Sequence, residues 1–369
     1  MAIMIYTLIL TFIFSFFSRG MDEYNKNLAS KYFIVITLCI LVAVPAFRTN
    51  IGDTYVYKRS FESMGSTSLL DIFNDFGDVG YYVFTFYLYR ISSNPQIMIF
   101  TTALITQVCY FKFFYKYRSY LELEIFMYIT SGYFFVTMNG IRQSLAAGIL
   151  VLATKYLIER NFKKYLLVVI FASLFHQSAL IMILIYFIVR SKPFSNGTFI
   201  MIIGAIIGVM LFNELIPPLF KLLQGSNYEH YEQVFKDGTE RGANILRVFV
   251  AMVPVILAYL RKEDLEEWEN GIIFTNMAII NLVFMIFSLK TWIFARFTIY
   301  FNLYNFILLP YIIRRWINQK EKRTLYLFCI LCYLLFFLVE QRAAERIKFF
   351  FINNNIFYNG INWFLCIGF

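Results

Sequence analysis

Three arginines stand at the ends of different apolar segments, in a sequence that is mostly apolar. Arg48 follows one such segment, Arg142 begins another and Arg296 begins a third. Ionised groups at a membrane boundary cost free energy, and those that are present tend to be functional. Arginine matches a phosphate with a planar fork of donors and keeps its charge in a partly dry site. The three arginines together indicate an anion-binding site, for which a diphosphate at the membrane boundary is a suitable ligand.

The second arginine has the most polar surroundings. Asn139 and Gln143 flank Arg142 in a tight turn, and the free amides of a helix that starts there would bind the same anion. For Arg48 and Arg296 the sequence leaves an alternative open, in which each side chain simply extends along the membrane surface toward water.

An aspartate and a histidine accompany the arginines. Asp53 lies five residues after Arg48 with a glycine directly before it, and His176 lies in an otherwise apolar run. Asp78, directly before Val79-Gly80, belongs to the same group of polar residues. An ionisable group at membrane depth is a functional hypothesis, but Asp53 could instead pair with Arg48, and His176 could be a hydrogen-bonded core residue.

The composition is that of a multi-span helical membrane protein, with 60% hydrophobic, 20% aromatic and only 15% charged residues. Many apolar runs approach the ~20 residues that a helix needs to cross a bilayer. They lie at about 2–17, 31–47, 95–111, 121–138, 141–158, 165–189, 198–222, 244–260, 271–289, 297–313 and 324–339. The net charge of +10 then reflects cytoplasmic loops that face anionic lipid headgroups, and we expect no nucleic-acid partner.

Several kinds of enzyme are excluded by their motifs. The sequence has no Walker loop, no G-x-S-x-G elbow and no H-E-x-x-H helix. With two histidines and no cluster of carboxylates, we expect no metal site, and no other cofactor is indicated.

Basic loops, which remain in the cytoplasm, give conflicting orientations for the segment 165–189. Lys163-Lys164 on one flank and Arg190-Ser191-Lys192 on the other both come out cytoplasmic, which a single crossing does not allow. We therefore expect this segment to enter and return as two half-length helices with an apex near 173–178, where His176 lies. Such backbone is tolerated where protein buries it or where it lines a wet cavity.

The competing solution makes 79–91 a further span, which would place six basic residues between 112 and 164 on the outside. We favour the re-entrant hairpin, in which 79–91 is an amphipathic helix at the outer interface. The loop 48–94, the turn at Asn139 and the apex near His176 then share the outer face.

These residues occur in an order that resembles the EpsG family of Wzy-like polymerases of bacterial exopolysaccharide and capsule. The matching pieces are Phe47-Arg48, Gly52-Asp53-x-Tyr55-x-Tyr57, Gly80-Tyr81, Asn139-x-x-Arg142-Gln143 with Ala146-Ala147, and His176-x-Ser178-Ala179. The resemblance covers about residues 45 to 180, and Arg296-Phe297 with Tyr300 extends it weakly.

The resemblance implies a membrane glycosyltransferase of the GT-C type in the bacterial cytoplasmic membrane. Such an enzyme joins polyprenyl-diphosphate-linked oligosaccharide repeats at the outer face into exopolysaccharide, capsule or O-antigen chains, without a metal. A flippase and a chain-length regulator of the same pathway are the partners that it implies, besides the lipid-linked substrate and membrane lipids.

Roles follow for single residues. Arg48, Arg142 and Arg296 would hold the diphosphate, with Arg142 also stabilising charge on the leaving group. The base is either Asp53 or His176: an acidic residue in the first outer loop is typical of GT-C enzymes, whereas histidine exchanges a proton near neutral pH. The residues that would contact sugar are Tyr55, Tyr57, Tyr81, Asn139, Gln143 and Tyr300, although an interfacial aromatic belt is an alternative for the tyrosines.

The sequence thus predicts an all-α, polytopic integral membrane protein with about 10–12 transmembrane helices, a re-entrant hairpin and a GT-C-like arrangement. Residues 1–346 would form one transmembrane domain, followed by an atypical tail over 347–369 that is rich in Phe, Ile and Asn. Three alternatives stay open: a transporter or flippase for lipid-linked oligosaccharide, although no internal repeat is visible, a polysaccharide ligase and a membrane O-acyltransferase.

Overall fold

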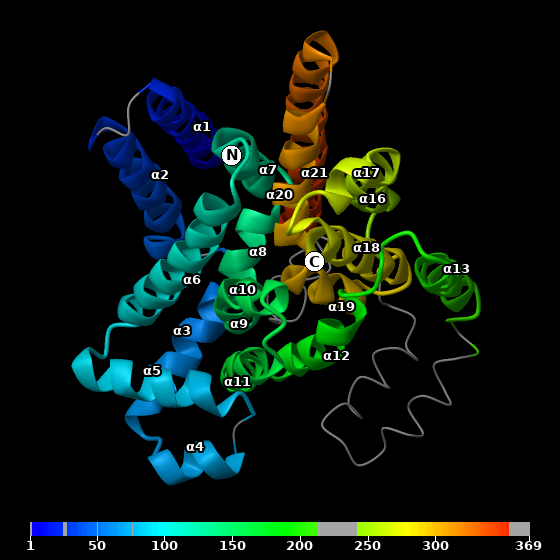
Figure 1. Ribbon diagram of the computed structural model, residues 1–369. Coiled ribbons are helices and arrows are strands. Elements are labelled where there is room, and N and C mark those ends of the chain that lie inside the picture. The colour runs from blue at the N-terminus through cyan, green and yellow to red at the C-terminus, as the bar shows by residue number, and fades with distance from the viewer. Residues whose placement is uncertain are drawn as a thin grey trace. The chain divides into compact units, whose positions relative to one another are not determined.

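The computed structural model describes residues 2–24, 28–49, 51–75, 77–212, 214, 242–316 and 318–353. Within these ranges the chain forms helices and no strands (Figure 1). It divides into two compact units, of which the first is Met1–Ile188 with Leu309–Arg342 and the second is Val189–Leu308 with Ala343–Phe369. The protein is therefore all-α, as predicted, and the single-domain organisation stays a prediction.

The first unit contains most of the helices. They are α1 (Ala2–Tyr24), α2 (Leu28–Ala46), α3 (Thr54–Glu62), η1 (Ser63–Gly65), α4 (Leu69–Asp75), α5 (Val79–Ile91), α6 (Gln96–Tyr117), α7 (Leu121–Thr130), α8 (Tyr133–Asn139), α9 (Ile141–Leu152), α10 (Thr154–Ile158), α11 (Phe162–Ser173), η2 (Gln177–Leu180) and α12 (Ile181–Ile188). Part of α21 (Gln319–Asn353) also belongs to it.

The second unit contains α13 (Asn196–Met210), α16 (Ile245–Leu260), α17 (Lys262–Glu266), α18 (Gly271–Phe287), α19 (Trp292–Phe297) and η3 (Thr298–Tyr300). The boundary between the units falls inside α20 (Asn302–Arg315). Of the tail at 347–369, residues 347–353 continue α21 and the rest lies outside the described residues.

The apolar helices identify a membrane protein. In the described ranges two helices are long and apolar enough to cross a bilayer, Gln96–Tyr117 and Gln319–Gln341, or three spans if the bent pair of α19–η3 and α20 counts as one. Seven shorter apolar helices of 10–17 residues accompany them. Pro45 in α2, Pro254 in α16 and Pro310 in α20 lie inside apolar helices, a feature more frequent in membrane helices than in soluble ones.

The predicted hairpin over 165–189 is present. The chain runs from α11 through a break at 174–176 into η2 and α12. The Phe162 ring at the start of α11 lies 4.9 Å from the Tyr186 ring and 5.2 Å from the Phe187 ring at the end of α12. Twelve residues of α11 reach only about 18 Å, about half of a bilayer core. The segment therefore returns to the end at which it begins, as its flanking charges predict.

Helices α3, α4 and α5 gather beyond the start of α6 in the loop predicted to lie outside (Figure 1). The structure places α5 over the same residues, 79–91, that the sequence assigns to an amphipathic helix. Its interfacial position stays a prediction.

Helix α6 packs against α2 and α9 and fixes the start of α9. The Tyr110 hydroxyl on α6 donates to the main-chain oxygen of Ser144 at 3.0 Å, in the first turn of α9. Further along, a side chain at Gly148 would place its Cβ 3.2 Å from the Cβ of Cys109, which is a tight contact, so α6 and α9 approach closely at this glycine. Arg142 stands at the beginning of the helix that these contacts hold.

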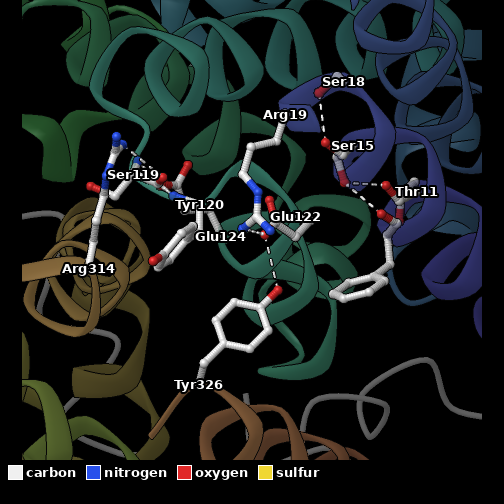
Figure 2. A network of polar contacts seen from close by, with 11 residues as sticks. Thr11, Ser15, Ser18, Arg19, Ser119, Tyr120, Glu122, Glu124, Arg314 and Tyr326 are labelled. Atoms are coloured by element: carbon white, nitrogen blue, oxygen red, sulfur yellow. Dashed lines mark hydrogen bonds and ion pairs between the residues drawn. The ribbon is translucent and has the colours of Figure 1, made fainter. Parts of the chain in front are cut away.

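A separate polar network joins α1, α7 and α21 (Figure 2). Glu122 on α7 is fully buried and pairs with Arg19 of α1, and it accepts a 3.0 Å hydrogen bond from the Tyr326 hydroxyl of α21. Nearby, the carboxylate of Glu124 accepts the amide of Ser119 at 2.6 Å. A buried carboxylate needs such partners. Through its contacts, Glu122 links three helices that are far apart in the sequence.

Candidate active site

One carboxylate connects an arginine and a histidine from different segments of the first unit. Asp78 precedes α5, Arg142 begins α9 and His176 lies in the break of the hairpin. Oδ2 of Asp78 is 2.8 Å from Nη1 of Arg142 and 3.0 Å from Nδ1 of His176. The side chain of Asp78 is 8% exposed, against 33% for Arg142 and 25% for His176. The arginine and the histidine can therefore meet a ligand, while the carboxylate behind them is buried.

The environment keeps Asp78 ionised. Burial has the largest single influence and acts to raise the pKa of Asp78. It is outweighed by the hydrogen bond of His176, the charge that His176 carries when its ring is protonated, the charge of Arg142 and the amide of Gln177. Together these hold the pKa of Asp78 below its usual range. A buried carboxylate of this kind requires several donors.

Asp78 and the hairpin cap one another. The amides of Gly80 and Tyr81 in the first turn of α5 both donate to the main-chain oxygen of Leu174, at 2.8 and 3.3 Å. In return, Oδ1 of Asp78 accepts the amide of Gln177 at the start of η2, at 3.0 Å. Free amides at a helix start need acceptors, and here each of two helix starts finds its acceptor on the other segment. The exchange joins α5 firmly to the break in the hairpin.

The close approach of these segments depends on Gly80. A Cβ at this position would lie 2.7 Å from the Cβ of Leu174 and 3.0 Å from its main-chain oxygen. Both distances are too short for non-bonded atoms. Gly80, which is part of the sequence pattern, is therefore needed for packing against the hairpin.

Tyrosines surround Arg142. The Tyr57 hydroxyl on α3 forms a hydrogen bond with the guanidinium of Arg142, whose Cζ lies 5.9 Å from the ring centre of Tyr82. The ring of Tyr81 stands at 6.2 Å from that of Tyr57 and at 5.5 Å from that of Tyr82. Tyr57 and Tyr81 are also close enough to Arg48 to influence its pKa. These two tyrosines thus lie near both Arg48 and Arg142.

Arg48 is a buried cation with a spare donor. Its side chain is 5% exposed, with Nε donating to Thr54 Oγ1 at 3.0 Å and Nη1 to the main-chain oxygen of Pro45 at 2.6 Å. Its Nη2 has no hydrogen-bond partner in the described part of the chain. Burial lowers the pKa of Arg48 to about 10, against the influence of Tyr57 and Tyr81, and the group stays charged at neutral pH. A buried charge with neutral partners is a strong binding point for an anion.

Asp53 belongs to the same region through its main chain. Its amide donates to Oδ1 of Asn139 at 2.9 Å, which joins the start of α3 to the turn before Arg142. The preceding Gly52 has φ of +54°, and a Cβ there would lie 2.1 Å from the same Asn139 oxygen. Both the backbone angle and the lack of space require glycine. On the other side of this turn, Nε2 of Gln143 lies 3.5 Å from Oγ of Ser178.

The structure brings together eight of the predicted residues: Arg48, Asp53, Tyr57, Tyr81, Asn139, Arg142, Gln143 and His176. Tyr55 on α3 is 66% exposed. Arg296 and Tyr300 belong to the second unit, where the guanidinium of Arg296 stacks 4.5 Å from the ring centre of Trp292 and Tyr300 is buried. Their part in a diphosphate or sugar site stays a prediction, as do the roles of the other residues.

Asp78 is the residue to which the sequence assigns no role. An aspartate directly before a helix is typical of an N-cap. Because capping already explains Asp78, the sequence gives no reason to expect its contacts with Arg142 and His176. In the structure its side chain makes no capping bond to α5. The signal that could have identified it is its place next to Gly80-Tyr81 within the ordered pattern.

The fold and the site define an all-α membrane protein with an arginine–aspartate–histidine cluster. The model of the EpsG family matches residues 31–357. Because this match covers most of the chain, the protein belongs to the EpsG family, a family of Wzy-like polysaccharide polymerases, and the resemblance found in the sequence is confirmed. A search of the curated proteins found no match, and neither did a search of the solved structures.

Proposed function

We propose that this protein polymerises polyprenyl-diphosphate-linked oligosaccharide repeats at the outer face of the bacterial cytoplasmic membrane. The observation that carries the proposal is the cluster of Arg142, Asp78 and His176, with the buried Arg48 beyond the tyrosines. It combines cations for a diphosphate with a group that can take a proton. The products would be exopolysaccharide, capsule or O-antigen chains.

Arg48 and Arg142 suit the diphosphate in different ways. Among the described residues Arg48 has only neutral partners, and its Nη2 has none, so that an anion would compensate its charge. The guanidinium of Arg142 contacts Asp78 and Tyr57, but a third of its side chain is exposed and can meet a ligand. Fixed cations away from bulk water stabilise the charge that grows on a leaving diphosphate, and a metal would not be needed.

The transfer itself needs a base for the acceptor hydroxyl. The oxygen of that hydroxyl attacks the anomeric carbon of the donor, its proton passes to the base, and the bond from this carbon to the diphosphate oxygen breaks. The polyprenyl diphosphate leaves with the electron pair. His176 is better placed for this role than Asp53, because its Nδ1 is held by Asp78 while Nε2 has no partner among the described residues.

The substrate of this reaction has to reach the outer face before it is joined. A flippase for the lipid-linked repeat and a regulator of chain length are therefore the partners that we propose. The multi-pass arrangement with the loop 48–94 outside is part of the same proposal, and it rests on the distribution of basic residues.

The test uses the purified full-length protein in lipid nanodiscs with its native lipid-diphosphate-linked repeat. Nucleotide sugars are omitted and a chelator is added, and chain length is observed on a gel. We expect a ladder of products in which the lipid diphosphate is released. A folded protein that gives no ladder would overturn the proposal, and a single transfer to another acceptor would replace the polymerase by a ligase.

Two variants of one residue and a control refine this test. Arg142→Ala should abolish the ladder, and Arg142→Lys should reduce it strongly because an ammonium group lacks the planar fork. Arg59→Ala is the matched control, since Arg59 is an exposed arginine on α3 in the loop 48–94 and should leave the ladder unchanged. A full ladder from Arg142→Ala would remove this residue from the mechanism.

A further inference from the structure

Helix capping does not explain the contacts of the Asp78 side chain. A capping aspartate accepts an amide two or three residues further along its own helix, and Asp78 makes no such bond. The main-chain oxygen of Leu174 serves those amides of α5 instead. The carboxylate is thereby free to face the hairpin, where it accepts donors from three separate groups.

These three donors distinguish a carboxylate from other side chains of the same shape. Oδ2 faces both Nη1 of Arg142 and Nδ1 of His176, and Oδ1 faces the amide of Gln177. An asparagine has one oxygen and one NH₂ group. Whichever way it turned, its NH₂ would face either the guanidinium or the Gln177 amide, which are both donors. The geometry requires an acceptor at both positions.

We propose that Asp78 is a positioning residue for the transfer reaction, which fixes the neutral imidazole of His176 with its proton on Nδ1 and ties it to the arginine that holds the donor diphosphate. The inference rests on the proposed function. A ring nitrogen that donates to a carboxylate keeps its proton, and the other nitrogen then carries the lone pair. Nε2 of His176 is accordingly the atom that takes the acceptor proton.

The shared carboxylate has a second consequence. Arg142 and His176 act at opposite ends of the reaction, on the leaving diphosphate and on the incoming hydroxyl. Because both contact the same oxygen of Asp78, their separation is set by one buried atom. Holding reacting groups at a fixed separation is a large part of what an enzyme contributes to a bimolecular transfer.

The decisive experiment measures the ring of His176 directly. The chain has two histidines, so protein labelled with ¹⁵N in histidine gives only two sets of imidazole signals, and loss of one set in His176→Gln assigns them. In the wild-type protein in nanodiscs we expect the neutral ring of His176 to carry its proton on Nδ1 and none on Nε2. A proton on Nε2 in the wild type would overturn the proposal, without any variant at position 78.

Substitution of Asp78 then tests the cause. In Asp78→Ala the ring loses its acceptor, and we expect its proton to move to Nε2 while the rate of chain growth falls about 10²- to 10⁴-fold. Glu62→Gln is the matched control, since Glu62 is an exposed carboxylate in the same outer segment and should change neither the tautomer nor the rate. An unchanged tautomer in Asp78→Ala would show that another group fixes the ring, and the proposal would fail.

The two readouts separate this inference from the proposed function. A protein with the proton on Nδ1 but no product ladder would contradict the polymerase activity. A ladder made by a protein with the proton on Nε2 would leave the polymerase in place and contradict the positioning role of Asp78.

Discussion

Replacing Gly80 by alanine should separate the two segments that form the site without unfolding the protein. The added Cβ would lie 2.7 Å from the Cβ of Leu174 and 3.0 Å from its main-chain oxygen, whereas carbon atoms in contact are about 3.5–4.0 Å apart. Helix α5 must therefore move away from the break in the hairpin by about 1 Å. Overpacking of this kind costs about 1–3 kcal/mol of the free energy of unfolding.

The effect on activity should be larger than the effect on stability. Asp78 is two residues before Gly80, and its contacts with His176 and Gln177 are both 3.0 Å long. A displacement of about 1 Å would stretch them beyond hydrogen-bond length. Misplacement of a reacting group by this distance lowers a rate about 100-fold. We expect Gly80→Ala to lose activity to this extent while it stays folded.

The measurement combines the rate of ladder formation with thermal unfolding of the same sample. Gly204→Ala is the matched control, because a Cβ on this helical glycine of α13 would meet no atom of the described residues within 4 Å, and alanine is the better helix former. A wild-type rate in Gly80→Ala would refute the reasoning that the contact between α5 and the hairpin holds the site. Complete unfolding would refute the magnitude of the strain.

Two further outcomes follow from the contacts. Tyr326→Phe removes the 3.0 Å hydrogen bond to the buried Glu122, which keeps Arg19 as a partner. We expect chemical unfolding to show a loss of about 1.5–3 kcal/mol in the free energy of unfolding and the gel assay to show an unchanged rate. A lower rate would connect this network to catalysis. The pKa of Asp78 is lower in the folded protein than in the unfolded chain, where it is about 3.9; its stabilisation is therefore present above that value and is lost as the pH falls through the folded-state pKa. The difference in Tm between wild type and Asp78→Asn should accordingly shrink from pH 5 to pH 3, and a difference that stays constant over this range would contradict the shift.

The hairpin could be predicted because its evidence is local. Basic residues on both flanks of 165–189 favour a hairpin over a single crossing, and the ring contact between Phe162 and Tyr186 shows the return of the chain. The helix at 79–91 was predictable for a similar reason, since its aromatic pattern and its bounds are both contained in one short segment.

The partner of His176 could not be predicted, because the contact joins residues that are 98 positions apart. A sequence pattern shows that Asp78 precedes a helix, and capping is then the simplest explanation. The contacts of the buried Glu122 with Arg19 and Tyr326 were missed for the same reason, as these three residues come from three distant helices. Local sequence contains no measure of which distant donor a carboxylate will meet.

The main-chain and side-chain contacts of Asp53 and His176 bear on the choice of base between them. The amide of Asp53 is held by Asn139, and the glycine before it has no room for a side chain, so this segment shapes the turn beside Arg142. His176 lies where the hairpin breaks, with an extended backbone that directs the chain from α11 into η2. Its ring is oriented by a buried carboxylate and a quarter of its side chain remains exposed. A base must be both fixed and reachable. The contacts and exposure of His176 meet both requirements, which supports it as the proposed base.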